Sequence, residues 1–199
     1  CMGIGDAYVD RAPLQVTQFE ASMVITDQVK KIFLEGGGGG NDGESYLIAH
    51  YFAAFKTKCD SQTKRKKKGY LFTIGDEPPL ATLTRDQIKE FIGDDVETDM
   101  TASDLISILQ PNWNVFHLII KPVGGDVVPR WRKLLAERAI EVANHEKLGE
   151  VIISTIQVIE GADADKVIKS WSGDTALVVA KAVGGLVKSD NAAVGVRRL

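Results

Sequence analysis

The chain has 199 residues, of which 44% are hydrophobic and 26% are charged, and its formal net charge is −3. This length and composition suffice for one sizeable hydrophobic core, or for one core and a small appendage. The slightly acidic balance gives no overall attraction to nucleic acid or to an anionic membrane, so we expect neither as a partner. No apolar run approaches the roughly 18 residues of a membrane span, and the first residues lack the layout of a signal peptide.

The two cysteines, Cys1 and Cys59, lie far apart in the sequence and form no metal-ligand spacing. This pattern indicates neither a disulfide framework nor a zinc site, and we expect the protein in the reducing cytoplasm. The chain begins with Cys-Met-Gly and enters a predicted strand at once, so we expect an incomplete or processed chain.

The first third of the chain predicts a hairpin followed by two helices. Short apolar segments on either side of a polar turn are typical of a β-hairpin, and apolar residues at helical spacing predict helices. The glycine run Gly36 to Gly40 ends the first helix, and Asn41 or Asp42 can cap the second. The predicted elements are a hairpin with strands 2–7 and 14–19, a helix over 24–33 and a helix over 41–58.

The middle of the chain alternates between apolar strands and amphipathic helices. The compact apolar run 70–74 ends in a Gly-Asp-Glu-Pro-Pro turn, which is typical of a buried parallel strand entering a loop. Thr84 and Gln87 have capping-box spacing, and Gly93 can close the helix that they begin. Further predicted elements are a short helix from Thr101, a strand over 115–120, a helix over 129–138, a strand over 139–143 and a helix over 147–160.

This alternation predicts an α/β fold of three layers, with a mainly parallel central sheet and the hairpin at one edge. We expect one α/β domain over residues 1–161 and a C-terminal helical extension over 162–199. Within the extension, an apolar face on the predicted helix 174–188 favours docking back onto the domain.

Three segments occur in a characteristic order: Met-Gly-Ile-Gly-Asp-Ala at 2–7, a glycine-rich turn leading to Glu44, and Phe-Thr-Ile-Gly-Asp-Glu-Pro-Pro at 72–79. Over roughly residues 1–160, this set resembles bacterial and phage-borne von Willebrand factor A (vWA) domains. The resemblance implies a Rossmann-like fold. It also implies a module that binds another protein rather than an enzyme, with a divalent cation, usually Mg2+, at the carboxyl ends of the parallel strands.

The resemblance also implies a set of metal ligands. The family uses an Asp-x-Ser-x-Ser strand end, a threonine from a second loop and an aspartate from a third. Asp76 matches the third-loop aspartate, and Asn41 and Asp42 stand at about the place of the threonine. The Asp-x-Ser-x-Ser element is absent from these 199 residues, and the resemblance would put it before Met2.

The chemistry at these positions suits a hard cation without reference to the family. Mg2+ prefers oxygen ligands and keeps several waters, and Asp76 follows a strand at the edge where open α/β sheets bind ligands. Asp6 ends the first predicted strand and is a candidate outer-shell group. The alternative is that Asp76 bonds to nearby backbone in its turn and that Asn41 or Asp42 only caps a helix. Because so few ligands remain, we expect weak or no Mg2+ binding by this chain alone.

Other functions stay open at this stage. One is a metal-assisted hydrolase that uses Asp76, Glu77 and a metal-bound water, and another is a structural component of a bacterial or phage assembly. The glycine run lacks the Gly-Lys-Ser/Thr ending of a phosphate-binding loop. The basic run 64–68 could contact phosphates or an acidic partner, but a mobile, solvated loop is favoured. We interpret the three histidines, His50, His117 and His145, as structural.

Overall fold

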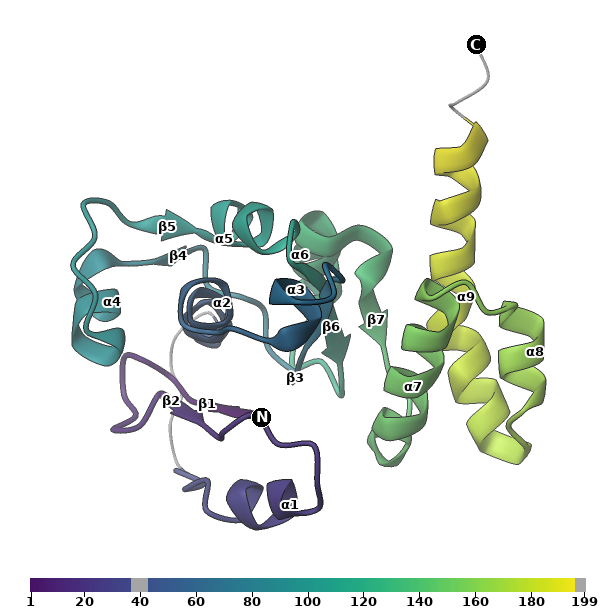
Figure 1. Ribbon diagram of the computed structural model, residues 1–199, viewed down its shortest axis with the longest axis horizontal. Helices are drawn as coiled ribbons and strands as arrows, with labels where there is room; N and C mark the ends of the chain where they lie inside the picture. Colours follow the sequence, from purple (N-terminus) through teal and green to yellow (C-terminus); the bar gives the residue numbers. More distant parts are fainter. Residues whose placement is uncertain (37–42, 196–199) are drawn as a thin grey trace. The chain divides into compact units, whose positions relative to one another are not determined.

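The computed structural model describes residues 1–36 and 43–195, with side chains described as far as Leu186 (Figure 1). Its contacts divide the chain into two compact units. The first unit comprises residues 1–69 and 78–112, and the second comprises 70–77 and 113–199. The strand that begins at Gly69 pairs with a strand formed more than forty residues later, which brings residues 70–77 into the second unit. The predicted boundary at residue 161 stays a prediction.

The first unit is built around helix α2, which is buried along most of its length. Seven of its ten residues are buried, which is why its sequence is apolar on nearly every side. Within residues 1–36 and 43–112, two antiparallel strand pairs and four further helices complete this unit. The elements of this unit are β1 (Met2–Ile4), β2 (Leu14–Val16), α1 (Val24–Val29), α2 (Tyr46–Phe55), α3 (Asp60–Thr63), β4 (Thr82–Leu83), α4 (Arg85–Ile92), β5 (Met100–Thr101) and α5 (Ala102–Leu109).

The predicted hairpin forms, but its predicted place at the edge of the central sheet is wrong. Among the described residues, β1 and β2 pair only with each other, with Met2 opposite Val16. The turn between them is fixed locally, because Gly5 N donates to Pro13 O and Asp6 N donates to the Asp10 carboxylate. A local turn sets the partner within a hairpin, but the sheet that a hairpin joins depends on distant residues.

The predicted capping box at Thr84 is confirmed, and the helix predicted to begin at Thr101 also forms. The Thr84 hydroxyl accepts from Gln87 N, the Gln87 side chain accepts from Thr84 N, and Gly93 ends α4 in the left-handed conformation, with a φ of 87°. Thr101 and Asp104 form the same reciprocal arrangement at the start of α5. Each cap satisfies backbone donors that the first turn of a helix leaves unpaired.

Replacing Thr84 by alanine is expected to lower the free energy of unfolding by about 1 kcal/mol, because Gln87 N then loses its acceptor. Urea denaturation followed by circular dichroism measures this loss. Thr98→Ala is the matched control, since the exposed Thr98 side chain makes no hydrogen bond among the described residues. Equal stability of the two variants would contradict a stabilising role for the cap.

The second unit contains a three-stranded parallel sheet with the order β3-β6-β7. β6 lies in the centre and six of its seven residues are buried, in accord with its continuous apolar sequence. The parallel pairing predicted for the strands at 70–74, 115–120 and 139–143 is therefore confirmed, with slightly different bounds. The predicted burial of 70–74 is wrong, because β3 lies at an edge of the sheet and only Thr73 in it is buried. The elements of this unit are β3 (Gly69–Gly75), β6 (Trp113–Ile119), α6 (Val127–Leu135), two 3-10 turns (Ala136–Arg138 and His145–Lys147), β7 (Ala139–Glu141), α7 (Leu148–Ile159), α8 (Ala164–Lys169) and α9 (Gly173–Gly195).

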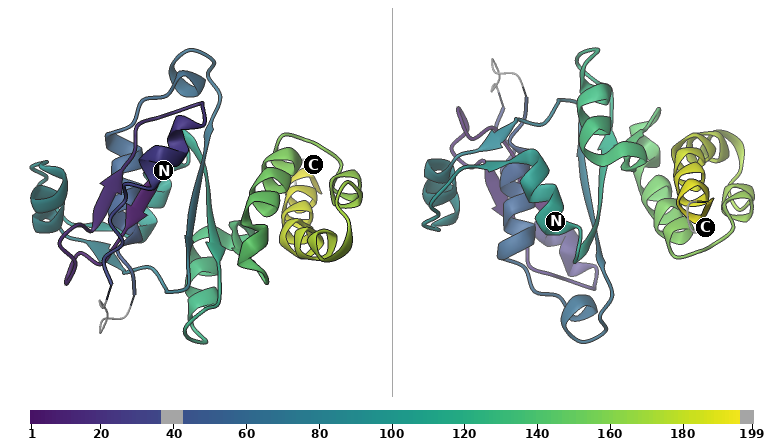
Figure 2. Two further views of the ribbon diagram at one scale, coloured as in Figure 1. Left: turned by 90° about the horizontal axis from the view of Figure 1, so that it is seen from below. Right: turned by 90° about the horizontal axis from the view of Figure 1, so that it is seen from above.

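The C-terminal helices belong to the core of this second unit. Both views in Figure 2 show α7, α8 and α9 side by side. Ala182 and Leu186 from α9 lie in one buried cluster with Phe116 and Leu118 from β6, so the predicted docking of this helix onto the sheet domain is confirmed.

Among the described residues, no helix has the length and apolar character needed to cross a bilayer. The chain thus has a mixed α/β fold that is compatible with a Rossmann-like arrangement.

Candidate functional site

The loop that follows β3 presents an exposed carboxylate on a firmly held backbone. Asp76 is the first residue after β3, and its side chain is exposed. Ile120 N donates to Gly75 O over 2.9 Å, and Val123 N donates to Asp76 O over 3.0 Å. These bonds attach the loop to the segment that follows β6. The carboxyl end of a parallel strand is where open α/β sheets bind ligands.

A third bond fixes the loop from beneath. The indole Nε1 of Trp131, on α6, donates to Glu77 O over 3.0 Å. The Trp131 ring is fully buried and stacks on His117 with 3.6 Å between ring centroids. The apolar spacing of Val127, Trp131 and Leu135 along α6 marks the buried face, but no sequence signal shows that the indole reaches Glu77.

Below the loop, β3 and β6 share a buried polar contact. The Thr73 hydroxyl lies 2.8 Å from His117 Nδ1 and also donates to Phe116 O over 3.3 Å. Because a hydroxyl has a single proton, the bond to Phe116 O implies that His117 Nδ1 donates to Thr73. Thr73 and His117 are both buried, so this contact positions neighbouring strands rather than meeting a ligand. The interpretation of His117 as structural agrees with this geometry.

Asp6 has a structural role in the first unit. It is 3% exposed, and its Oδ1 accepts from Tyr8 N over 2.9 Å. Its backbone oxygen accepts from Val9 N and Asp10 N, so Asp6 organises the hairpin turn. Asp76 belongs to the second unit. A role for Asp6 as an outer-shell group of a site at Asp76 stays a prediction.

Asn41 and Asp42 lie outside the described residues, so their predicted role as ligands stays a prediction. The helix that either could cap begins later than predicted, at Tyr46, with Ser45 in the N-cap position. The physical reason is the backbone just before it. Gly43 has a φ of 146°, and a side-chain carbon there would lie 2.4 Å from Pro78 O, so this extended approach requires glycine.

The oxygen ligand that the described part of the site presents at the end of β3 is the exposed carboxylate of Asp76. Within residues 1–36 and 43–186, no group of three or more His, Cys, Asp or Glu side chains is arranged to hold a metal ion. The Asp76 carboxylate makes no hydrogen bond or ion pair with another described residue. Mg2+ binds commonly through one or two carboxylates and retains waters, so Asp76 suits a shell that other oxygen donors complete.

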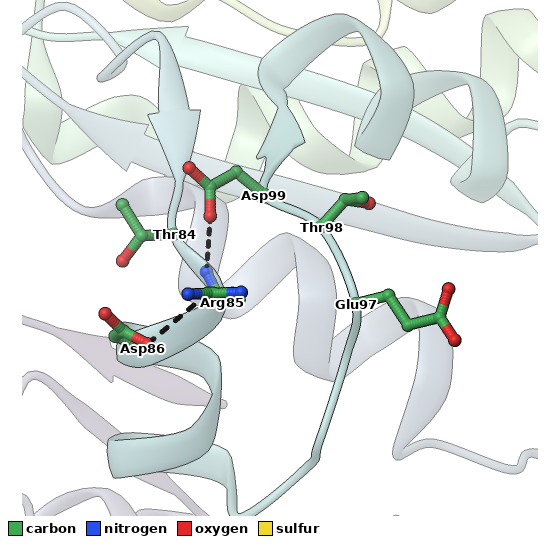
Figure 3. A pocket seen from close by; sticks show the side chains of 6 residues that line it. All are labelled: Thr84, Arg85, Asp86, Glu97, Thr98 and Asp99. Carbon is green, nitrogen blue, oxygen red and sulfur yellow. Dashed lines mark hydrogen bonds and ion pairs between the residues drawn. The ribbon is translucent and has the colours of Figure 1, made fainter.

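The first unit carries a separate open pocket of about 490 Å³ at the start of α4 (Figure 3). Arg85 is surrounded there by acidic side chains: its backbone nitrogen donates to the Asp99 carboxylate, and its Nε lies 3.7 Å from Asp86. The charged side chains of this pocket are exposed, and no histidine or cysteine joins them. The lining residues are Thr84, Arg85, Asp86, Glu97, Thr98 and Asp99.

A second titratable cluster joins the end of α2 to the segment after α4. The Tyr51 hydroxyl donates to Asp94 over 2.9 Å, and the Lys56 ammonium group contacts the other oxygen of the same carboxylate. The hydrogen bond from Lys56 lowers the pKa of Asp94, and burial together with Asp94 raises the pKa of Tyr51 to about 12. Tyr51 is therefore protonated at neutral pH. These contacts hold the end of α2 against the segment that follows α4 within the first unit.

Comparisons of the chain with models of protein families, with curated proteins and with solved structures find no match in any of the three. What this chain binds is therefore inferred from the residues at the carboxyl end of β3.

Proposed function

We propose that the chain is a vWA-like protein-binding module in which Asp76 and a divalent cation, Mg2+, bridge to a carboxylate of the partner. The observation that supports this most is the exposed Asp76 carboxylate at the carboxyl end of a parallel strand. One protein carboxylate and water leave positions of a magnesium shell open, which a partner's carboxylate can fill. The three-layer vWA arrangement is part of the same proposal, supported by the parallel order β3-β6-β7 and its flanking helices.

The way the loop is held favours binding over catalysis. Three hydrogen bonds fix the backbone from Gly75 to Glu77, so a partner meets a carboxylate whose position needs little ordering. A hydrolase would need a base or acid within reach of the reacting water. No described titratable side chain contacts the Asp76 carboxylate, and His117 is occupied beneath the loop by Thr73.

Mn2+, a paramagnetic stand-in for Mg2+, is expected to bind the chain weakly and to broaden the amide signals around Asp76 in nuclear magnetic resonance spectra. Asp76→Asn should remove this broadening, because it replaces the exposed carboxylate by a neutral amide. Adding a glutamate-containing peptide should tighten Mn2+ binding by about tenfold, since the peptide carboxylate completes the shell.

Glu77→Gln is the matched control, because it removes a neighbouring carboxylate and leaves the backbone acceptor of Trp131 in place. Broadening that survives Asp76→Asn, or that Glu77→Gln removes equally, would disprove the assignment of the ligand. A screen of ester and phosphoester substrates with Mg2+ or Mn2+ tests the rival function. Turnover that Asp76→Ala abolishes would favour the hydrolase.

A further inference from the structure

The chain concentrates positive charge in one short stretch, residues 56–68, here called the basic segment. This segment holds seven of the 24 Lys and Arg residues and one of the 27 Asp and Glu residues. The remaining 186 residues therefore carry 17 basic and 26 acidic side chains. A chain of net negative charge thus has one strongly basic stretch of sequence at 56–68, and this stretch belongs to the first unit.

The basic segment has a defined backbone rather than the loop predicted from sequence. It contains helix α3, after which Arg65 N donates to Asp60 O and Lys67 N donates to Ser61 O over 2.8 Å. Gln62 Nε2 donates to Asn112 O over 2.9 Å and ties the turn to the end of the unit. Lys66 has a φ of 55°, which is the left-handed conformation of a tight turn. A fixed turn loses less conformational entropy when it binds than a mobile loop does.

Six of the seven cations of the basic segment fall into two groups, and the seventh, Lys67, also has an interaction of its own. Lys56 contacts Asp94, Lys64 lies 2.9 Å from Asp60, and Lys68 donates to Gln110 O over 2.7 Å, so these three support the fold. Lys58, Arg65 and Lys66 are exposed, and they make no hydrogen bond or ion pair among the residues that the structure describes. Arg65 and Lys66 lie on the turn and Lys58 lies just before α3, and these three cations can meet an anionic partner without first breaking internal bonds.

Two features decide the class of anion. No aromatic side chain lies within residues 56–68, whereas proteins that bind single-stranded nucleic acid stack bases on aromatic rings. The rest of the chain has 26 acidic and 17 basic side chains, so its net charge adds no general attraction for a long polyanion such as nucleic acid. A short acidic stretch of protein supplies carboxylates for these cations, and the Arg65 guanidinium can pair with a carboxylate through two parallel hydrogen bonds.

We infer that the basic segment is a docking surface for an acidic segment of another protein, with Lys58, Arg65 and Lys66 as the contacting cations. The surface is independent of the function proposed for Asp76, because it uses residues of the first unit and requires no divalent cation. Contacts of this kind raise the rate of association and select partners by charge.

The test uses a labelled oligoglutamate peptide and the full chain in the presence of EDTA, with binding followed by fluorescence anisotropy. We expect binding that weakens as sodium chloride is added. The triple variant Lys58→Gln/Arg65→Gln/Lys66→Gln should weaken it by about tenfold, because three exposed ion pairs are lost. The matched control is Lys30→Gln/Lys31→Gln/Lys169→Gln, which removes the same charge from exposed positions elsewhere. It should retain nearly all of the affinity.

Three results would overturn the inference. The first is that the chain fails to bind the peptide at low salt, and the second is that both triple variants lose affinity equally, which would show an effect of overall charge alone. The third is that a short DNA duplex binds more tightly than the peptide at the same salt concentration, which would assign the surface to nucleic acid. Circular dichroism spectra identical to that of the wild-type chain would show that the variants are folded. Because EDTA removes the divalent cation that the function proposed for Asp76 requires, binding in its presence tests the basic segment alone.

Discussion

Replacing Trp131 by alanine is expected to lower the free energy of unfolding of the second unit by about 3–5 kcal/mol. The indole is fully buried, so its removal leaves a cavity beside His117, with which it stacks at 3.6 Å. The substitution also removes the donor to Glu77 O, and a carbonyl that loses its partner in a protected position costs free energy. Packing and hydrogen bonding therefore act in the same direction.

Urea denaturation followed by tryptophan fluorescence measures this loss selectively. All three tryptophans belong to the second unit, so Trp113 and Trp171 still report its unfolding in the variant. Trp131→Phe separates the two contributions, since it keeps an aromatic ring but lacks the indole donor, and it should cost only about 1–3 kcal/mol. Trp131→Phe should also speed hydrogen exchange at the Val123 amide. This amide donates to Asp76 O, and the loop that contains Asp76 is less firmly held without the indole donor. A loss below about 1 kcal/mol for Trp131→Ala would contradict the packing described here.

Acidification from pH 6.5 to pH 4 is expected to destabilise the first unit by up to about 3 kcal/mol through His50 alone. His50 lies on α2 with no exposed surface, and burial lowers its pKa from 6.5 to about 4. Below pH 6.5 the unfolded chain takes up a proton at His50, whereas the folded chain resists protonation until about pH 4. The stability that the first unit gains from keeping His50 neutral is thus fully present above pH 6.5, and it is lost as the pH falls toward 4.

Hydrogen exchange of the α2 amides, corrected for intrinsic exchange rates, measures this dependence at a series of pH values. In His50→Leu, the difference in the free energy of unfolding between pH 6.5 and pH 4 should shrink by about 3 kcal/mol. The pH dependence that persists in this variant should come from the carboxylates. The control is His145→Gln, which removes an exposed histidine of the second unit and should leave the pH dependence of α2 in place. Parallel pH profiles for the wild-type chain and His50→Leu would refute the assignment to His50.

The elements that sequence reasoning found correctly are those set by nearby residues. Helix α4 is an example. Its N-terminal capping box involves Thr84 and Gln87, its last turn ends at Gly93 in the left-handed conformation, and each feature depends on residues within one or two helical turns. β6 was recognised because strands buried on both faces are continuously apolar. β3 was recognised by a similar apolar run, although it lies at an edge of the sheet and Thr73 is its one buried residue. For the candidate site, the same reasoning placed Asp76 at the end of a parallel strand, and the structure agrees.

Features that depend on distant residues needed the tertiary structure. The link from Trp131 to Glu77 joins positions 54 residues apart, and the place of the hairpin depends on which sheet accepts it. The late start of α2 follows from the approach of Gly43 to Pro78 O, and the local pattern gives no sign of that contact. Local sequence thus determined where most helices and strands form, because capping and periodicity act over a few residues. Only the tertiary structure decided which residues support Asp76, because contacts between distant segments form when the chain packs.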